Sequence, residues 1–253
     1  MATKLDYFDQ MGKLQSKSTL ISTSQEGDGR QALILDSTIF HPQGGGQPSD
    51  TGLISSADDS FKFVVEDVRS KGGIVFHYGC FETGEEEFGS GKLDGKEVFL
   101  FVDKARRNLN SRLHSAGHLI DVCLEGVGLG HLKPGKAYHF PDGPYVEYQG
   151  TVQQDKWQTK QQELEIEANA LISKGGKITA ATLSYEEALQ LCGGSLPDYI
   201  SKSSNPRIVT LGNYPGCPCG GTHVPDISDI NSLKVTQLRS KKGMTKVFYN
   251  VDS

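Results

Sequence analysis

The pattern of apolar residues changes near residue 103, and this change is the strongest constraint that the sequence places on the fold. Before that point, short apolar runs at Gln31–Phe40, Phe61–Val68 and Gly73–Tyr78 are separated by glycine-rich or polar turns. Short strands punctuated in this way are typical of a small β-barrel. After that point, helical and strand-like runs alternate. The sequence therefore predicts an α+β protein, in which an N-terminal β-barrel domain precedes a mixed α+β domain.

The second domain begins with a long predicted helix. Asp103 is a residue type that caps helix N-termini, and Gly126 and Gly128 end the helical pattern after Glu125. One face of the helix is apolar, and its residues recur at helical spacing: Leu109, Leu113, Ala116, Ile120 and Cys123. The sequence thus predicts a helix that packs one side against a core.

The remaining elements and the domain boundary follow from the same patterns. Two further helices are expected over residues 154–173 and 185–191. Strands are expected over residues 137–149, 177–183, 207–211, 233–238 and 245–251. We place the boundary within Gly84–Asp103, which gives a barrel domain of residues 1–95 and a second domain of residues 103–253.

The composition limits the classes of partner. The 253-residue chain carries a formal net charge of −5, which argues against a protein that coats nucleic acid nonspecifically. A local basic patch could still bind one defined RNA end, and two segments offer one: Lys104–Arg112 and Arg239–Lys246. No apolar stretch approaches the roughly 18 residues of a membrane span, and we find no secretory signal. We therefore expect a cytoplasmic location and neither a membrane nor DNA as a partner.

Two histidines lie four residues apart in the long predicted helix, in the sequence His114-Ser-Ala-Gly-His118. Residues at this spacing share a helix face, so both imidazoles can reach one metal ion. A zinc protease motif needs glutamate directly after the first histidine, and Ser115 stands there instead. Taken alone, the pair is a weak signal, because two surface histidines would show the same spacing.

The second signal is the segment Cys217-Pro-Cys219-Gly-Gly-Thr-His223. Cys219 and His223 offer a thiolate and an imidazole in a glycine-rich loop that can bend both side chains inward. Together with the histidine pair they form a Cys/His₃ set of borderline-soft ligands, which suits Zn²⁺. The chain has five cysteines, an odd number that argues against a disulfide framework. Cys217 could replace Cys219 as the minor option, and a structural turn with a buried thiol is the alternative.

The third signal is a glycine-rich segment over residues 40–52, FHPQGGGQPSDTG. Three consecutive glycines expose backbone amides that can approach a phosphate or a neighbouring backbone. The segment has neither the lysine of a Walker loop nor the glycine spacing of a dinucleotide loop. A tight turn within a barrel explains it equally well.

In this order and separation, the three motifs resemble the editing domain of alanyl-tRNA synthetases and its free-standing relatives, the AlaX-type trans-editing proteins. The Gly-Gly-Gln…Asp-Thr-Gly loop, the HxxxH helix and the sequence Cys219–Val224 carry the resemblance, which spans residues 30–250. The resemblance implies that one Zn²⁺ per chain is bound by His114, His118, Cys219 and His223. It also associates the tRNA acceptor end or the editing pocket with Gly44, Gly45, Gly46 and Gln47.

The sequence departs from the family in one place that concerns the substrate. In many synthetase domains the histidine motif reads His-Thr-x-Thr-His, whereas Ser115 and Gly117 stand at the two threonine positions here. The loop after the helix, Gly130–Gly135, also lacks the glutamine found in those domains. A site that hydrogen-bonds the serine hydroxyl rejects alanine strongly. Ser115 and Thr222 are our candidates for that catalytic role.

The resemblance implies a hydrolase that cleaves the ester between a wrong amino acid and tRNA(Ala), with serine as first substrate and glycine as second. Arg106 and Arg107 adjoin the zinc helix, and we expect them to contact the tRNA acceptor stem. Four protein ligands would close a tetrahedral site, so either one ligand is loose in the working state or zinc expands its coordination. Zinc could activate water, polarise the carbonyl or position the substrate. Two alternatives stay open: a deacylase for another mischarged tRNA, such as seryl-tRNA(Thr), and a non-catalytic RNA-binding module with a structural zinc.

Overall fold

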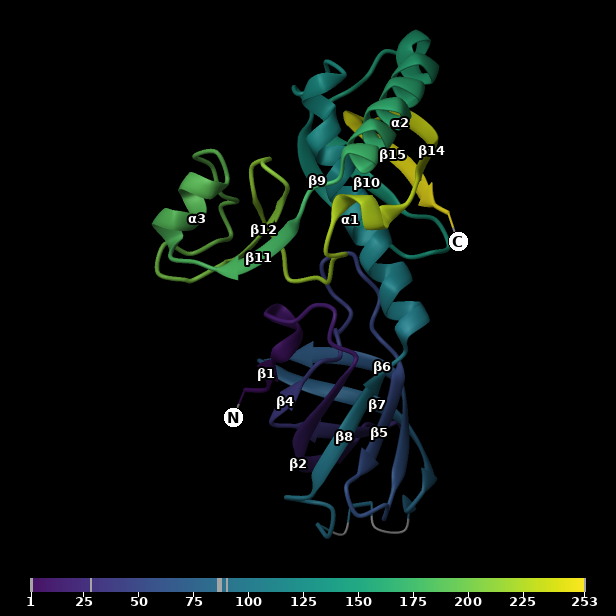
Figure 1. The fold of residues 1–253 in the computed structure, drawn as a ribbon, viewed down its shortest axis with the longest axis vertical. Helices are drawn as coiled ribbons and strands as arrows, with labels where there is room; N and C mark the ends of the chain where they lie inside the picture. The colour runs from purple at the N-terminus through teal and green to yellow at the C-terminus, as the bar shows by residue number, and fades with distance from the viewer. Residues whose placement is uncertain (1, 28, 86–87, 90, 253) are drawn as a thin grey trace. The chain divides into compact units, whose positions relative to one another are not determined.

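The computed structural model of the chain describes residues 2–27, 29–85, 88–89 and 91–252. The fold is mixed α+β (Figure 1), as the sequence predicts. Its contacts divide the chain into two compact units, one of Met1–Gly44 with Pro48–Asn108 and one of Gly45–Gln47 with Leu109–Ser253. Three residues of the glycine-rich segment therefore group with the second unit. Among the described residues, no helix is both long enough and apolar enough to cross a membrane.

The first unit contains a closed barrel with the strand order β2-β3-β7-β6-β5-β8 (Figure 1). Its strands are β2 Gln15–Gln25, β3 Gln31–Leu35, β5 Gly52–Ser56, β6 Lys62–Lys71, β7 Ile74–Thr83 and β8 Glu97–Val102. β8 closes the barrel by pairing antiparallel with both β2 and β5. Alternate side chains of β8, such as Val98 and Leu100, are buried in the interior. The unit also holds a short parallel pair, β1 Lys4–Leu5 with β4 Ser37–Thr38, and the 3₁₀ turn η1 Asp6–Phe8.

The predicted barrel is confirmed, although it contains more strands than the apolar runs indicate. The runs that begin at residues 31, 61 and 73 overlap β3, β6 and β7. β2 has little apolar content, since its sequence is QSKSTLISTSQ, and of its two large apolar residues Leu20 is buried and Ile21 is exposed. β8 lies inside the stretch expected to hold the domain boundary, so the barrel continues to Val102 and does not end at residue 95.

The long helix α1, Lys104–Gly126, forms where the sequence predicts it. The Asp103 carboxylate accepts a hydrogen bond from the backbone nitrogen of Arg106 at 3.0 Å, as an N-cap residue does. Leu113, Ala116 and Ile120 from the predicted apolar stripe are buried in the core of the second unit. Because the apolar stripe packs into the core, it fixes the rotation of α1 about its axis and so the direction of the polar side chains beside the stripe.

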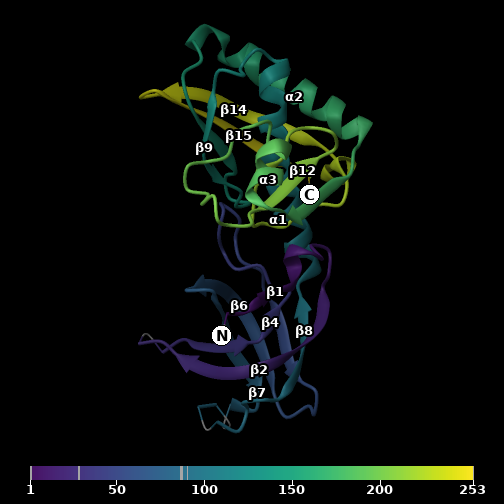
Figure 2. The same ribbon diagram turned by 90° about the vertical axis from the view of Figure 1, so that its left-hand side faces the viewer.

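A four-stranded sheet with the order β14-β15-β10-β9 shares this core. Its strands are β9 Lys133–Tyr138, β10 Tyr145–Gln149, β14 Leu233–Lys241 and β15 Met244–Val251. Helix α2, Trp157–Lys174, follows the short turn η3, Gln154–Lys156, and lies along β14 (Figure 2). Gln161 Nε2 donates to the Val235 carbonyl at 2.8 Å, and Asn169 Nδ2 donates to the Leu233 carbonyl at 2.7 Å. These bonds satisfy backbone groups that an edge strand would otherwise expose.

A three-stranded sheet leads into the second sequence signal. Its strands, in spatial order, are β11 Ile178–Thr182, β12 Arg207–Leu211 and β13 Cys217–Pro218. The helix α3, Tyr185–Leu191, lies between β11 and β12 in the chain, and the turn η4, Ile227–Ile230, follows β13. Because Cys217 pairs with Val209 on β12, the start of the cysteine-rich loop is fixed by backbone hydrogen bonds.

Candidate metal centre

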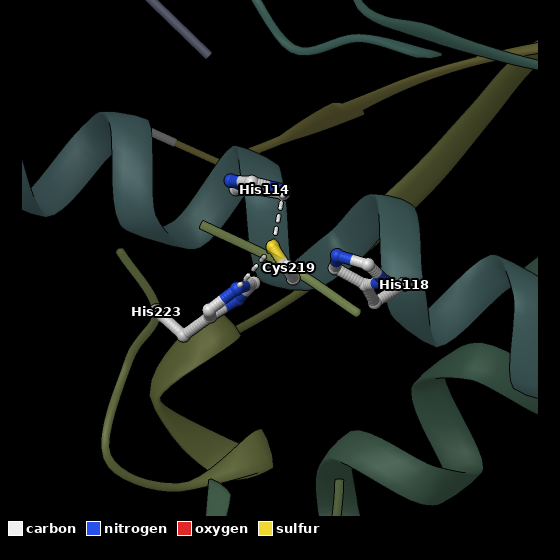
Figure 3. Close-up of side chains that lie close together, drawn as sticks. All are labelled: His114, His118, Cys219 and His223. Carbon is white, nitrogen blue, oxygen red and sulfur yellow. Dashed lines mark hydrogen bonds between the residues drawn. The ribbon is translucent and has the colours of Figure 1, made fainter. Parts of the chain in front are cut away.

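The four side chains that were predicted to bind a metal meet in one cluster (Figure 3). Helix α1 contributes His114 and His118, and the loop after β13 contributes Cys219 and His223. One potential ligand atom from each residue lies within 4.8 Å of those of the others. The Cys219 Sγ atom lies 3.4 Å from His114 Nε2 and 3.3 Å from His223 Nε2. The cluster could therefore hold a metal ion.

Contacts from β12 and the small size of a glycine hold the loop against α1. The Arg207 guanidinium donates through Nη1 to the carbonyl oxygens of Cys219, at 2.7 Å, and Gly221, at 3.0 Å. A Cβ atom on Gly221 would lie 2.2 Å from His114 Cε1, a distance that no side chain tolerates. Glycine at this position thus lets the loop approach the helix closely enough for Cys219 to reach His114.

Each histidine of the cluster has its Nδ1 atom in contact with a neighbouring polar group. The pairs are His114 with Gln47 Oε1 at 2.7 Å, His223 with Ser115 Oγ at 3.1 Å, and His118 with Cys217 Sγ at 3.2 Å. Partners of this kind orient the imidazole ring and direct its other nitrogen, Nε2, toward a metal. Cys217, the minor alternative for a ligand, therefore contacts the outer nitrogen of His118, and the thiol of the cluster is that of Cys219.

Two observations show that the cluster fits a metal ion. Gln47 Oε1 also accepts a hydrogen bond from the backbone nitrogen of Thr222 at 3.0 Å, which fixes the orientation of the amide. Because an amide oxygen only accepts, the proton of His114 lies on Nδ1 and its Nε2 carries the lone pair. His118 Nε2 is buried and has no hydrogen-bond partner among the described residues. A buried nitrogen without a partner is unfavourable, and a bound metal ion would satisfy it.

Burial favours the uncharged forms of the potential ligands. It lowers the pKa of His118 to about 4, so this imidazole is neutral at neutral pH. Burial raises the pKa of the Cys219 thiol, although the Gly221 backbone N–H, which donates to the sulfur, acts in the opposite direction. Burial also raises the pKa of the nearby Asp121 to about 6. Because ligands bind metals in their deprotonated form, a divalent cation would displace the proton of the thiol.

Comparison with known proteins shows which protein family the chain belongs to. Residues 3–106 match the family model of the tRNA synthetases class II (A), and residues 207–247 match that of the threonyl and alanyl tRNA synthetase second additional domain. The alanyl-tRNA editing protein AlaX-M of Methanosarcina barkeri is 30% identical over 221 residues, which are 86% of this chain and 87% of that protein. The chain belongs to the AlaX family of alanyl-tRNA editing proteins.

Two longer relatives contain the same region as a part of their length. The alanyl-tRNA editing protein AlaX-L of Pyrococcus horikoshii is 30% identical over 223 residues, which are 88% of this chain and 51% of that protein. The alanine–tRNA ligase of Ignicoccus hospitalis is 29% identical over 227 residues, which are 87% of this chain and 23% of the ligase. The AlaX-family chain described here thus spans about half of the length of AlaX-L and a smaller part of the ligase.

The hydroxyl groups of Ser115 and Thr222, which were predicted to read the substrate, are engaged within the protein. Ser115 is buried, and its Oγ contacts His223 Nδ1 and accepts a hydrogen bond from the Val224 backbone nitrogen at 3.2 Å. Thr222 is also buried, and its Oγ1 accepts from Gln47 Nε2 at 2.9 Å. These bonds support the ligand-bearing loop of this AlaX-family chain. Contact between either hydroxyl and a substrate stays a prediction.

The glycine-rich segment has an exposed part and a buried part. Gly44 and Gly45 are exposed, whereas Gln47 is buried beside the Cys/His₃ cluster. Gly46 has a φ of +81°, and a Cβ atom there would lie 2.5 Å from the Ala137 carbonyl oxygen, so only glycine fits. Gln47 was predicted to lie at the tRNA acceptor end or in the editing pocket, and its side chain contacts His114 of the cluster.

Arg107 does not face solvent, contrary to the prediction that it contacts tRNA. Its side chain is 1% exposed and forms an ion pair with Asp50, in which Nη2 and Oδ2 are 2.5 Å apart. Its other donors bind two backbone carbonyls of the first unit. The charge is therefore neutralised inside that unit and cannot reach a phosphate. Arg106 is half-buried and donates through Nε to the Ser49 carbonyl at 2.8 Å, which leaves it partly accessible.

Sequence reasoning did not find His139, which follows β9. Its ring stacks on that of His114, with the ring centroids 4.4 Å apart. Burial, and to a smaller extent the neighbouring His118, lowers the pKa of His139 to about 3. No spacing rule connects His139 with the histidine pair on α1, because it reaches the site from a different element. In the sequence it lies inside the strand expected over residues 137–149, and no neighbouring motif marks it.

Proposed function

We propose that the chain is a trans-editing hydrolase that cleaves the aminoacyl ester of tRNA(Ala) mischarged with serine, and with glycine as a second substrate. The observation that carries this proposal is the Cys/His₃ cluster, whose potential ligand atoms lie within 4.8 Å of one another. The names of the AlaX relatives and the family model over residues 207–247 support alanyl-tRNA editing in general. The cytoplasmic location stays a prediction.

We assign one Zn²⁺ to the cluster, held by His114, His118, Cys219 and His223. Three imidazoles and one thiolate are a donor set that suits zinc, whereas magnesium and calcium prefer oxygen ligands. When bound, the ion would polarise the ester carbonyl or lower the pKa of a water molecule. An aminoacyl ester is already reactive, so the chain has to position the ester and the water more than it has to supply a strong nucleophile.

The chain's own residues prepare the site for this ester. Gln47 fixes the tautomer of His114, and Ser115 holds the ring of His223 through its Nδ1 atom. The bond between Gln47 and Thr222 joins the glycine-rich segment to the cysteine-rich loop. Because these polar groups are satisfied by one another before any substrate binds, little reorganisation is needed when charge develops on the ester. We assign this chemistry to the editing domain proposed for residues 103–253.

We place part of the tRNA-binding surface on exposed cations of the second unit. A cavity of about 530 Å³ on β14 and β15 is lined by Trp157 and by four cations, Arg239, Lys241, Lys242 and Lys246. Glu147, the single acid in this described lining, pairs with Lys246 at 3.4 Å. Such cations can bind phosphates while the indole offers a face to a base. Contacts of the acceptor end with Gly44, Gly45 and Arg106, which are exposed or half-buried, stay separate predictions.

Hydrolysis of purified esters tests the proposed activity. The zinc-loaded chain is incubated with seryl-, glycyl- and alanyl-tRNA(Ala) and compared with His118→Ala and with the control His131→Ala, which removes an exposed histidine outside the cluster. We expect rapid loss of the seryl and glycyl esters and survival of the alanyl ester. His118→Ala should abolish both hydrolyses, and His131→Ala should leave them unchanged.

Seryl-tRNA(Thr) is the second candidate substrate, because the family model over residues 207–247 describes threonyl as well as alanyl synthetases. The same incubation with this ester separates the two. Cleavage of seryl-tRNA(Thr) alone would reassign the substrate. Survival of all four esters in the presence of zinc-loaded chain would overturn the hydrolase proposal, and retained tRNA binding would then support an RNA-binding module with a structural zinc.

A further inference from the structure

His139 lies against the metal centre without belonging to the predicted ligand set. Its side chain is 2% exposed. Its ring covers one face of the His114 ring, at a centroid distance of 4.4 Å and an interplanar angle of 24°. The His118 ring is farther away, with centroids 6.5 Å apart. His139 therefore contacts the centre mainly through His114.

Hydrogen bonds fix both the backbone and the ring of His139. The backbone nitrogen donates to the Gly46 carbonyl at 2.8 Å. Its Nδ1 atom lies 2.5 Å from the Tyr249 hydroxyl oxygen, and that hydroxyl donates its only proton to the Leu113 carbonyl at 2.9 Å. The tyrosine oxygen must therefore accept from the imidazole, which places the proton of neutral His139 on Nδ1. The ring is held in one orientation as a result.

Gly117 provides the space that the His139 ring occupies. A Cβ atom on Gly117 would lie 2.3 Å from His139 Cε1 and 2.8 Å from its Nδ1. Any other residue at position 117 would therefore displace the ring. Glycine inside a helix is less favourable than alanine, so its place between the two histidines of α1 calls for a reason. Accommodation of the His139 ring supplies one.

We propose that His139 is a positioning residue of the metal centre and acts through His114. The His139 ring restrains the face of the His114 ring, and Gln47 holds the edge of the same ring at Nδ1. The two contacts together keep His114 Nε2 directed at Cys219 before a metal binds. This inference rests on the metal site of the proposed function, and it adds to the four predicted ligands the residue His139 and a role for Gly117.

The zinc affinity of the full chain, measured by competition with a chromophoric chelator, tests this inference. His139→Ala should weaken zinc binding by about 10- to 100-fold, as the loss of an outer partner does in other metal sites. His139→Phe keeps an aromatic face against His114 and should recover most of the lost affinity. His131→Ala is the matched control and should bind zinc as the wild type does.

A double-mutant cycle separates positioning from a general effect on folding. Gly117→Ala should weaken zinc binding although alanine favours a helix, because the new Cβ atom displaces the ring. In the His139→Ala background the same change should have no further effect, since the two side chains no longer meet. The melting temperatures of the metal-free variants show whether the fold is retained.

The outcomes distinguish the inference from the proposed function. Wild-type affinity in both His139→Ala and Gly117→Ala would overturn the inference while the metal site stands. Additive losses in the double variant would overturn it as well, because independent effects do not pass through one contact. A wild-type chain that fails to bind zinc would overturn the proposed function together with the inference.

Discussion

The two basic segments of the chain, Lys104–Arg112 and Arg239–Lys246, look alike in sequence and differ in the structure. In the first, Arg107 is buried in an ion pair with Asp50, and Arg112 donates to a backbone carbonyl. In the second, the cations line a surface cavity on β14 and β15. The first segment forms the first turns of α1, which pack against other parts of the protein. The second segment lies on both sides of the turn between β14 and β15, where side chains are exposed. A cluster of charges indicates a binding surface only where the local structure turns those charges outward.

Arg107→Ala should have the largest effect, on stability. The substitution leaves the Asp50 carboxylate, which is 0% exposed, without its partner. Breaking a buried pair in this way lowers the free energy of unfolding by about 3–5 kcal/mol. Unfolding in urea measures this change, and Lys241→Ala, which removes an exposed cation of the other segment, is the control. Equal stability of the two variants would contradict the structural role of Arg107.

Removal of two exposed cations should act on tRNA binding and spare stability. The variant Arg239→Gln with Lys241→Gln removes two exposed charges of the hairpin. The slope of log K against log salt concentration should become shallower by about 2 units, one for each phosphate that the variant no longer neutralises. Filter binding of tRNA over a range of salt concentrations measures the slope. An unchanged slope would remove this cavity from the tRNA-binding surface.

Arg112→Ala should have the smallest effect of the three, and it should be confined to stability. Arg112 donates through Nε and Nη2 to the Ile230 carbonyl, at 3.2 and 2.9 Å, from a half-buried position. Loss of these bonds should lower the free energy of unfolding by about 1 kcal/mol. Urea unfolding and tRNA binding are measured side by side. A loss of tRNA affinity at unchanged stability would show that the first segment contributes to tRNA binding.

The metal-ligand candidates could be predicted from the sequence because the information that places them is local. His114 and His118 share a helix face by their spacing alone, and Cys219 and His223 lie in one short loop. Their joining into one cluster depends on tertiary structure. The sequence indicated it because the two half-sites together complete a Cys/His₃ donor set, and the family resemblance assigned the same four residues. The outer contact of Gln47 with His114 spans 67 residues, and no spacing rule reaches that far.

The fold shows the same division between local and long-range information. Capping by Asp103 and the apolar stripe of α1 follow from neighbouring residues, and both were predicted. Strand β2 was not predicted, because it has few apolar residues and is held in the barrel by backbone pairing with β3 and β8. Arg107 is buried because it pairs with Asp50, which lies 57 residues earlier. No sequence pattern links these two residues.

In the proposed function, a metal ion held by the Cys/His₃ cluster carries the hydrolysis of mischarged tRNA(Ala). The most direct test removes the metal by chelation and follows seryl-tRNA(Ala) hydrolysis as Zn²⁺ is titrated back. We predict loss of activity after chelation, full recovery at one zinc ion per chain, and no recovery in His118→Ala. Undiminished hydrolysis by the metal-free chain would contradict the claim.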